Sequence, residues 1–364
     1  MQYHSVVEGS TRLKVPVGGG VTKREEVFYN PHMALNRDLT VALCKRLNPG
    51  SFLDLMAGTG ARGLRVACES GVDVTLNDLN PRAVDLIGEN ARSNGLDVSV
   101  ENIEARRILA DRMFDYVDVD PFGTPVEFVE SAVSSVRRGG VLGVCATDTS
   151  ALCGSYPRAC MRKYDATPLR CDCYDEIGLR ILVGFIARTA MRQGRGVEPL
   201  LSHSTRHYIR CQVRVVGRPS QTLKNLSYLQ YCFNCLWRGY RRLEEIRPLC
   251  ECGGELRVAG PLWSGRCSDQ QTCNVLADEI LSGNYGCRSE ASRLLELLAG
   301  EQTLNLPYYD LHKLCSRNSV SAPPMKSASK EAESLGFMFL RVHFNSTGFK
   351  TDMPIGQLGE LIRG

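Results

Sequence analysis

A short apolar run that ends in closely spaced glycines constrains the fold of this chain more than any other feature. Residues 51–57 form the apolar run, and Gly58, Gly60 and Gly63 follow it, after which apolar residues recur at helical spacing. An apolar run that gives way to glycines and then to helical periodicity is typical of a strand, a tight turn and a helix. The pattern therefore predicts one strand–helix unit of an α/β protein.

The alternation of strand and helix continues along the chain. Further strands are predicted at 72–77, 98–100, 114–119 and 140–146, and a helix is predicted from Pro81 to about residue 93. Strands that alternate with helices at such intervals form a parallel sheet with helices on both faces. The sequence thus predicts a doubly wound α/β domain.

The length of the chain indicates a second, smaller domain. With 364 residues the chain exceeds the ~100–200 residues typical of one domain. A helix at 174–192 and a strand at 207–216 extend the first domain, and a polar stretch at 224–226 follows them, so we predict domains at 1–222 and 223–364.

The second domain is predicted to be α+β. Three short helices are expected at 290–299, 308–315 and 326–335, followed by a hairpin of 337–342 and 348–351. Three helices and a hairpin resemble a winged helix, although a fold of this kind does not by itself imply a function.

Composition and hydropathy restrict the location and the partners of the protein. The longest apolar run, 181–187, is far shorter than the ~20 residues that a membrane-spanning helix needs, and residues 1–14 lack the apolar segment of a signal peptide. We therefore expect a cytoplasmic protein without a membrane partner, and no feature calls for an obligate protein partner. Arginine supplies 35 of the 44 basic residues, and guanidinium groups suit bidentate phosphate contacts, so RNA is a permitted partner.

The glycine-rich turn is suited to holding a nucleotide-like cofactor. Glycine lets backbone approach a ligand, and the following helix offers free N–H groups. Asp78 lies twenty residues after Gly58, at the end of the next predicted strand, where a carboxylate can accept both hydroxyls of an adenosine ribose. This spacing fits a dinucleotide or S-adenosylmethionine, and Asp54, four residues before Gly58, favours S-adenosylmethionine, as does the motif described next. Glycines that serve only close strand–helix packing are the alternative.

The tetrapeptide Asp120-Pro121-Phe122-Gly123 follows the fourth predicted strand, at the edge where open α/β sheets bind their ligands. The exocyclic amine of a base is a poor nucleophile because its lone pair is delocalised into the ring. Hydrogen-bond acceptors on its N–H groups hold the lone pair towards a methyl donor and absorb the charge that develops. Asp120 and the Pro121 carbonyl can supply two acceptors, and Phe122 offers a face for stacking. The motif predicts amine methylation, with a buried aromatic turn as the alternative.

Seven stretches of the chain resemble the tRNA guanine-26 N2-methyltransferases, and their archaeal members in particular. The matching stretches are 27–38, 54–63, 119–123, 145–149, 202–208, 260–265 and 350–352, in the order that the family has them. The resemblance covers the chain from end to end. It implies a Rossmann-type S-adenosylmethionine domain joined to a family-specific C-terminal domain that binds tRNA.

The same resemblance implies roles for individual residues. The cofactor would be contacted by Arg37, Arg62, Asp78, Glu104 and Ala105, while Asp120 would serve the guanine amine and Phe28 and Phe122 would sandwich the base. Glu104 stands where the family commonly has Asp. The aromatic segment 28–31 can fold over the pocket as a loop, with a core-packed strand as the alternative, and Arg37 could equally be a solvated surface charge.

Four cysteines in the second domain have nearly the spacing of a zinc ribbon. Cys232 and Cys235 form one pair and Cys250 and Cys252 a second, with fourteen residues between the pairs. Because the second pair is tighter than usual, the fourth ligand could instead be Cys267 or Cys273. Four thiolates leave no position for water, so such a Zn²⁺ would be structural. Four free buried thiols are the alternative.

Arginines and aromatic residues between the two cysteine pairs suit an RNA contact. They are Arg238, Arg241, Arg242 and Arg247, with Trp237 and Tyr240 among them. A solvated loop is the alternative.

Together these features predict S-adenosylmethionine-dependent methylation of the exocyclic N2 of guanine 26 in tRNA. The alternatives are methylation of another exocyclic amine, such as adenine N6, and an RNA-binding protein without activity. The motifs do not distinguish one methyl transfer from two.

Overall fold

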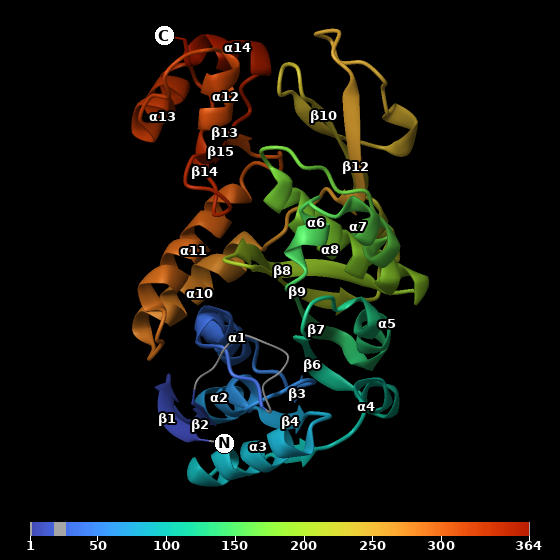
Figure 1. The fold of residues 1–364 in the computed structure, drawn as a ribbon, viewed down its shortest axis with the longest axis vertical. Helices are drawn as coiled ribbons and strands as arrows, with labels where there is room; N and C mark the ends of the chain where they lie inside the picture. Colours follow the sequence, from blue (N-terminus) through green and yellow to red (C-terminus); the bar gives the residue numbers. More distant parts are fainter. Residues whose placement is uncertain (1, 18–26, 364) are drawn as a thin grey trace.

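The computed structural model describes residues 2–17 and 27–363, and a seven-stranded sheet lies at its centre (Figure 1). The strands are β3 (Ser51–Asp54), β4 (Asp73–Asn77), β5 (Ser99–Glu101), β6 (Phe114–Val119), β7 (Val136–Ala146), β8 (Gly196–Thr205) and β9 (Tyr208–Val216). Their order in the sheet is β5-β4-β3-β6-β7-β9-β8. The five strands predicted for the first part of the chain are all present and parallel to one another.

The sheet is mixed, which corrects the prediction of a wholly parallel sheet. Strand β9 is antiparallel to both β7 and β8. Only residues 206–207 separate β8 from β9, and a connection of that length can join only antiparallel neighbours. Strand β8 was not predicted from the sequence.

Helices cover both faces of the sheet. The helices of this half are α1 (Ala34–Leu47), α2 (Ala61–Ser70), α3 (Pro81–Ser93), α4 (Ala105–Asp111), α5 (Val126–Ser135), α6 (Thr149–Leu152), α7 (Pro157–Tyr164) and α8 (Tyr174–Arg192). Neighbouring residues of β3 belong to different cores: Phe52 packs with residues of α1 and α2, whereas Leu53 packs with residues of α5 and α8. Because successive strand residues point to opposite faces, the sheet is buried on both sides, as the sequence predicts.

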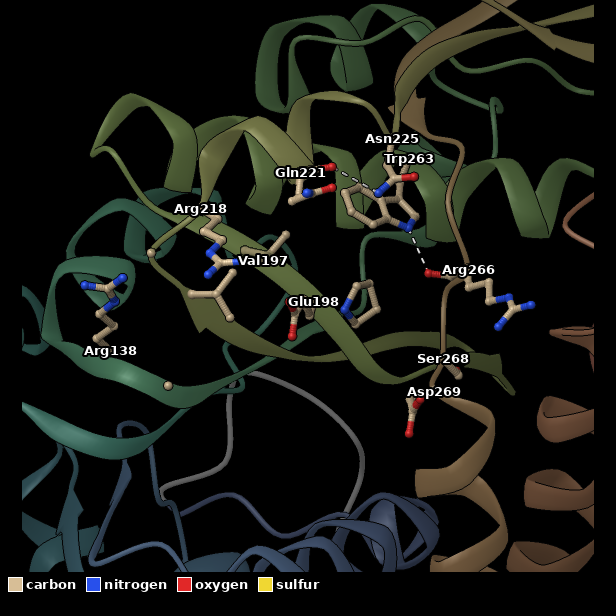
Figure 2. A pocket seen from close by; sticks show the side chains of 14 residues that line it. Arg138, Val197, Glu198, Arg218, Gln221, Asn225, Trp263, Arg266, Ser268 and Asp269 are labelled. Atoms are coloured by element: carbon tan, nitrogen blue, oxygen red, sulfur yellow. Dashed lines mark hydrogen bonds between the residues drawn. The ribbon is translucent and has the colours of Figure 1, made fainter.

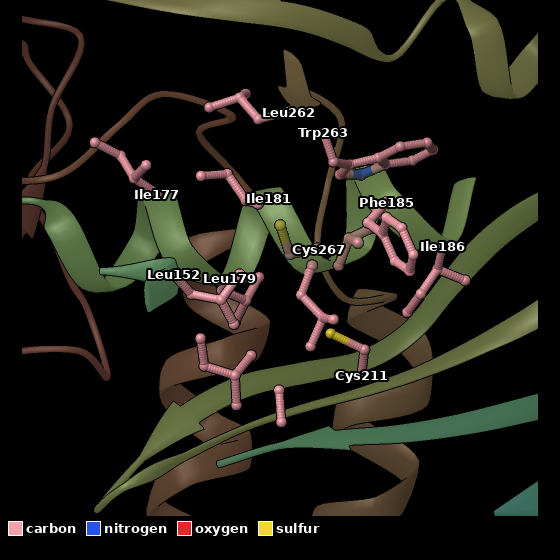
Figure 3. Close-up of a cluster of buried hydrophobic side chains, with 14 of the residues drawn as sticks. Leu152, Ile177, Leu179, Ile181, Phe185, Ile186, Cys211, Leu262, Trp263 and Cys267 are labelled. Carbon is pink, nitrogen blue, oxygen red and sulfur yellow. The ribbon is translucent and has the colours of Figure 1, made fainter. Parts of the chain in front are cut away.

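Helix α8 lies between the sheet and residues 256–263 of the second half of the chain (Figure 3). Its residues pack with Cys211 of β9 and with Leu262 and Trp263 of β12 (Leu256–Trp263), all within one core. A Cβ atom on Gly184 would lie 3.0 Å from the backbone nitrogen of Trp263. A glycine at this position therefore allows the backbone of β12 to approach the helix closely.

The second half contains two small sheets and six α-helices among its described residues. Its elements are α9 (Pro219–Leu223), β10 (Leu226–Cys232), β11 (Arg238–Arg241), β12, α10 (Gln270–Ser282), α11 (Arg288–Glu301), β13 (Tyr309–Asp310), α12 (Leu311–Arg317), α13 (Met325–Ser334), β14 (Leu340–Arg341), β15 (Gly348–Lys350) and α14 (Ile355–Leu361). The sheets have the orders β11-β10-β12 and β13-β15-β14. The boundary predicted at 222/223 stays a prediction, because the core around α8 continues across it.

The three short helices and the hairpin predicted near the C-terminus are present as α11, α12, α13 and the pair β14–β15. The second helix begins at Leu311 rather than at residue 308. Tyr309 and Asp310 pair with β15, and the Asp310 carboxylate then caps the helix by accepting the N–H of Lys313 (2.8 Å).

The N-terminal residues add a hairpin of β1 (Tyr3–Glu8) and β2 (Thr11–Pro16). In the part of the chain that the structure describes, no helix combines the length and the apolar character needed to cross a membrane.

Candidate active site

The glycine-rich turn between β3 and α2 is fixed by Asp78, at the carboxyl end of β4. One carboxylate oxygen of Asp78 accepts the N–H of Gly58 (2.8 Å), and the other accepts the N–H of Asn80 (2.9 Å). Gly58 and Gly60 both have positive φ, +56° and +80°, a conformation that favours glycine. Each oxygen of Asp78 retains a second lone pair, so the carboxylate can still accept hydroxyl groups of a ribose.

Asp54 braces the same turn from inside the protein. Its carboxylate is 2 % exposed and accepts the N–H of Gly63 (2.9 Å). Burial raises the pKa of Asp54 to about 7, against the opposing effect of the Arg62 guanidinium. Asp54 therefore supports the glycine-rich turn from the protein interior and does not face the solvent side of that turn.

Asp120 stands at the carboxyl end of β6 and is held by a buried arginine. The Arg62 guanidinium forms an ion pair with Asp120, and its Nε lies 3.2 Å from Oδ1 of Asp118. Nη1 of Arg62 donates to Asn36 Oδ1 (3.1 Å) and Thr40 Oγ1 (3.0 Å). Arg62 is 6 % exposed and the Asp120 side chain 19 % exposed. The arginine supplies a fixed counter-charge while Asp120 stays accessible.

Two further residues of this network were missed by the sequence reading. Asp118, fully buried in β6, forms an ion pair with the buried Arg210 of β9. A carboxylate between two valines of a predicted buried strand indicates a buried partner, and this signal could have identified Asp118. Arg210 has no local signal, because it lies ninety-two residues away in the chain.

The turn that follows Asp120 is tied to the segment after β7. The N–H of Gly123 donates to Thr147 Oγ1 (2.7 Å), and the N–H of Thr147 donates to the Gly123 carbonyl (2.9 Å). Among the described residues, no group donates to the carbonyl oxygen of Pro121. This oxygen and the Asp120 carboxylate therefore remain two acceptors at the carboxyl edge of the sheet.

The two phenylalanines predicted to enclose a base touch one another. The ring centroids of Phe28 and Phe122 are 4.5 Å apart, and the ring planes meet at 80°. A Cβ atom on Gly58 would lie 2.9 Å from the carbonyl oxygen of Phe28, so the aromatic segment passes directly over the cofactor turn. Segment 28–30 is a loop and not a core strand. The rings must separate before a base can lie between them.

Arg37 is buried, which excludes the reading as a solvated surface charge. Arg37 is 5 % exposed, and its Nε donates to Glu8 Oε2 (2.7 Å). Tyr29 donates its hydroxyl to the same carboxylate (2.6 Å). Although burial would raise the pKa of Glu8, the ion pair with Arg37 holds it below its usual value. Glu8 and Tyr29 fix the loop next to Phe28, and neither was predicted as a site residue.

Glu104 and Ala105 lie at the start of α4, beyond the carboxyl end of β5. The Glu104 side chain caps the helix by accepting the N–H of Arg107 (3.1 Å). Both residues are at the same edge of the sheet as Asp78 and Asp120, so their position permits contact with a cofactor bound there. The contacts themselves stay a prediction.

The four cysteines between β10 and β12 form a compact cluster. The sulfur atoms of Cys232, Cys235, Cys250 and Cys252 all lie within 4.8 Å of one another. Two of the distances, Cys232 to Cys252 and Cys235 to Cys250, are 3.6 Å. Tetrahedral Zn²⁺ with Zn–S bonds of about 2.3 Å requires sulfur atoms about 3.8 Å apart. The donor set and its spacing thus fit Zn²⁺.

Cys252 is the fourth member of this cluster in the described structure, whereas Cys267 and Cys273 are buried in the two hydrophobic cores. Hydrogen bonds from the Asn234 side chain and the Gly254 N–H lower the pKa of Cys252 to about 6. The outer sulfur of the cluster therefore ionises readily, as a metal ligand must.

The arginines between the cysteine pairs differ in their access to solvent. Arg238 is 5 % exposed, its Nη2 is 2.9 Å from Asp172, and its Nη1 donates to the Tyr308 carbonyl (2.6 Å). The prediction of an RNA contact is therefore wrong for Arg238. Arg242 and Arg247 are exposed, as the prediction requires.

A hollow of about 810 Å³ lies at the opposite edge of the sheet (Figure 2). It is lined by the start of β7, the start of β8 and the end of β9, with Trp263 and Arg266 beside them. None of its described lining residues is a predicted site residue. Because β7 is parallel to β6, the start of β7 is at the far edge from Asp120, so the hollow is separate from the candidate active site.

Comparisons with known proteins agree over nearly the whole chain. A family model described as N2,N2-dimethylguanosine tRNA methyltransferase matches residues 5–363. Relatives named tRNA (guanine(26)-N(2))-dimethyltransferase include those of Methanothermobacter thermautotrophicus, 37% identical over 99% of this chain and 98% of the relative, and Methanosphaera stadtmanae, 36% identical over 100% and 97%.

A solved structure described as Trm1 from Pyrococcus horikoshii in complex with S-adenosyl-L-methionine is also similar. It is 33% identical, covers 99% of both chains and has a TM-score of 0.90. The similarity therefore includes the cysteine-containing half as well as the sheet.

Proposed function

Because the chain belongs to the N2,N2-dimethylguanosine tRNA methyltransferase family, we propose that it transfers methyl groups from S-adenosylmethionine to the exocyclic N2 of guanine 26 in tRNA. The products are N2-methylguanosine and N2,N2-dimethylguanosine. The main structural support is the position of Asp120. It lies at the carboxyl edge of the sheet, beside the turn fixed by Asp78.

The residues at this edge fit an adenosine-containing cofactor. Asp78 would accept the ribose hydroxyls, and Gly58 and Gly60 leave the turn without side chains that could obstruct the ligand. S-adenosylmethionine, when bound, supplies a methyl group on a positively charged sulfur that an amine lone pair can attack. Arg37 and Glu104 are further candidates for cofactor contacts, one from the helix after Phe28 and one from the start of α4.

Asp120 and the Pro121 carbonyl would bind the two hydrogens of the guanine N2. Acceptance of both hydrogens directs the nitrogen lone pair away from the protein and towards the methyl donor. As the N–C bond forms and the methyl–sulfur bond breaks, the sulfur would leave as a neutral thioether. One N2 proton would pass to the Asp120 carboxylate, which would also stabilise the positive charge on nitrogen. Arg62 holds Asp120 in place throughout, so that the acceptor needs no rearrangement.

Phe28 and Phe122 would enclose the target base. In the structure their rings meet edge to face, and Phe122 is 44 % exposed. A guanine that enters between the two rings would replace their mutual contact with one stacking contact to each ring. These two contacts would compensate for the stacking that the base loses when it leaves the tRNA stack.

The cysteine cluster would hold a structural Zn²⁺ on Cys232, Cys235, Cys250 and Cys252. The close spacing of the four sulfur atoms supports this proposal. We also propose that the protein acts in the cytoplasm, because its proposed substrate is tRNA.

Nucleoside analysis of a tRNA transcript tests the proposed reaction. We expect incubation with the protein and S-adenosylmethionine to give N2-methylguanosine and then N2,N2-dimethylguanosine at position 26, as measured by mass spectrometry. A transcript with adenine at position 26 is the matched control and should stay unmethylated. Methylation of that adenine would favour the adenine-N6 alternative, and no methylation of either transcript would contradict the proposal.

A further inference from the structure

Helix α7 has a solvent-exposed face next to the turn that carries Asp120. Cys160 and Tyr164 on its inner side are fully buried in the core. Tyr156, just before the helix, is 66 % exposed, whereas Arg158 and Arg162 are exposed along its outer side. A large aromatic side chain and two guanidinium groups are therefore presented together to solvent.

The two arginines lie one helical turn apart. Residues at positions i and i+4 are neighbours on one face of a helix, and like charges at this spacing destabilise it. Neither Arg158 nor Arg162 forms an ion pair or hydrogen bond with any residue in 2–17 or 27–363. Lys163, next to them, differs because its Nζ is paired with Asp148 (2.9 Å). The outer face thus has two uncompensated positive charges that an anionic ligand could neutralise.

Hydrogen bonds connect the inner side of α7 to Thr124, which directly follows the turn of residues 120–123. Thr124, directly after the Asp-Pro-Phe-Gly sequence, donates its hydroxyl to the Tyr164 hydroxyl (3.1 Å). The Tyr164 hydroxyl in turn donates to Asp148 Oδ1 (2.6 Å), just before α6. Figure 1 shows α6 and α7 side by side. These hydrogen bonds attach the C-terminal end of α7 to the segment that directly follows Phe122, so the helix is fixed relative to the proposed guanine site.

We infer that α7 binds the tRNA strand that flanks the target guanine, an inference that rests on the proposed function. Arg158 and Arg162 contact two neighbouring phosphates, and Tyr156 stacks on a base next to the target. Charge complementarity and continuity with the proposed guanine site favour RNA as the occupant. The surface is distinct from the exposed arginines near the cysteine cluster, Arg242 and Arg247.

Salt-dependent tRNA binding tests the phosphate contacts. In the double variant Arg158→Ala with Arg162→Ala we expect about tenfold weaker tRNA binding near 0.1 M salt. The slope of log affinity against log salt should fall by roughly 1.5, because each lost phosphate contact removes about 0.7–0.9. The matched control is Arg46→Ala with Arg92→Ala, which removes two exposed arginines at the C-terminal ends of α1 and α3, at the other edge of the sheet.

Tyr156 gives a second, independent readout. Tyr156→Ala should raise the KM for tRNA several-fold with little change in kcat, whereas Tyr156→Phe keeps the ring and should behave as wild type. S-adenosylmethionine affinity verifies that every variant is folded, and Arg158→Gln with Arg162→Gln replaces the alanine pair if that pair does not fold.

The possible failures can be distinguished. If the wild type methylates guanine 26 but the α7 variants match the control pair in affinity and salt slope, the inference about α7 is wrong and the proposed function stands. If the wild type transfers no methyl group to tRNA, the proposed function itself is wrong. Loss of affinity without any change in salt slope would also overturn the assignment of phosphate contacts.

Discussion

The carboxyl edge of the central sheet and the cysteine cluster achieve local order in different ways. At the sheet edge, Asp120 and Asp118 are paired with Arg62 and Arg210, so the protein supplies every counter-charge itself. In the cluster, four thiol groups crowd together and would repel one another as thiolates unless a cation is present. The first region is complete without a ligand, whereas the second would need the proposed Zn²⁺ to balance its thiolates. The comparison predicts that the two regions respond differently to metal removal and to substitution.

The largest difference should appear when the metal ligands are disrupted. We expect Cys235→Ser to abolish the binding of about one zinc per chain and to raise hydrogen exchange in 226–263, because structural zinc contributes on the order of 10 kcal/mol to local folding. The sheet should stay protected, since it contains none of these cysteines. Cys68→Ser, another half-buried thiol, is the matched control. Wild-type protein that contains no zinc when purified without chelators would contradict the proposal that the cysteine cluster needs a metal.

A substitution of Arg62 tests the other region. Arg62→Ala leaves Asp120 without its ion pair and Asp118 with only Arg210, so we expect the free energy of unfolding to fall by ~3–5 kcal/mol in urea denaturation. The exposed pair of Arg106 with Glu127 provides the control, and Arg106→Ala should cost at most about 1 kcal/mol. Equal losses in the two variants would show that the sheet edge is not organised by its buried charges.

The proposed role of Asp120 would link the charge network to catalysis. Asp120→Ala should lower the rate of methyl transfer by at least ~10²-fold, the size expected for loss of a general base, while S-adenosylmethionine binding stays near wild type. Asp120→Asn tests charge separately, because it keeps an acceptor oxygen but cannot take a proton. Near-normal turnover in both variants would remove Asp120 from the proposed mechanism.

Asp78 should give the smallest of these effects. Asp78→Ala removes the proposed ribose contact and two hydrogen bonds to the turn, so we expect S-adenosylmethionine binding to weaken by ~1–3 kcal/mol in calorimetry. tRNA affinity should change little. Asp85→Ala, an exposed carboxylate on α3, is the control. A change below twofold in the Asp78 variant would argue that the carboxylate only supports the turn.

The sequence predicted the features that depend on neighbouring residues and missed those that depend on distant ones. The strands ending at Asp78 and Asp120 and the turn at Gly58 could be predicted because each pattern lies within a short stretch. Strand β8 was not predicted, although a two-residue turn joins it to β9. The pairing of β9 with β7, which puts β8 at the sheet edge, could not be predicted because the whole fold decides it.

The same limit applies to the site. Arg62 and Asp120 are 58 residues apart in the chain, and Arg238 reaches Tyr308 across 70 residues. The sequence alone does not show whether an arginine side chain is solvated or buried. Only the fold shows that Arg37 and Arg238 are enclosed, with carboxylates from remote segments, while Arg158 and Arg162 are not.

The two-sided packing of α8 constrains how this chain can change in evolution. The helix contacts the sheet on one side and β12 on the other, and Gly184 fits closely against the backbone at Trp263. A larger residue at 184 would require a compensating change in the other half of the chain. The second half is therefore not a module that could be exchanged freely between methyltransferases: it would have to be inherited together with the helix that it covers.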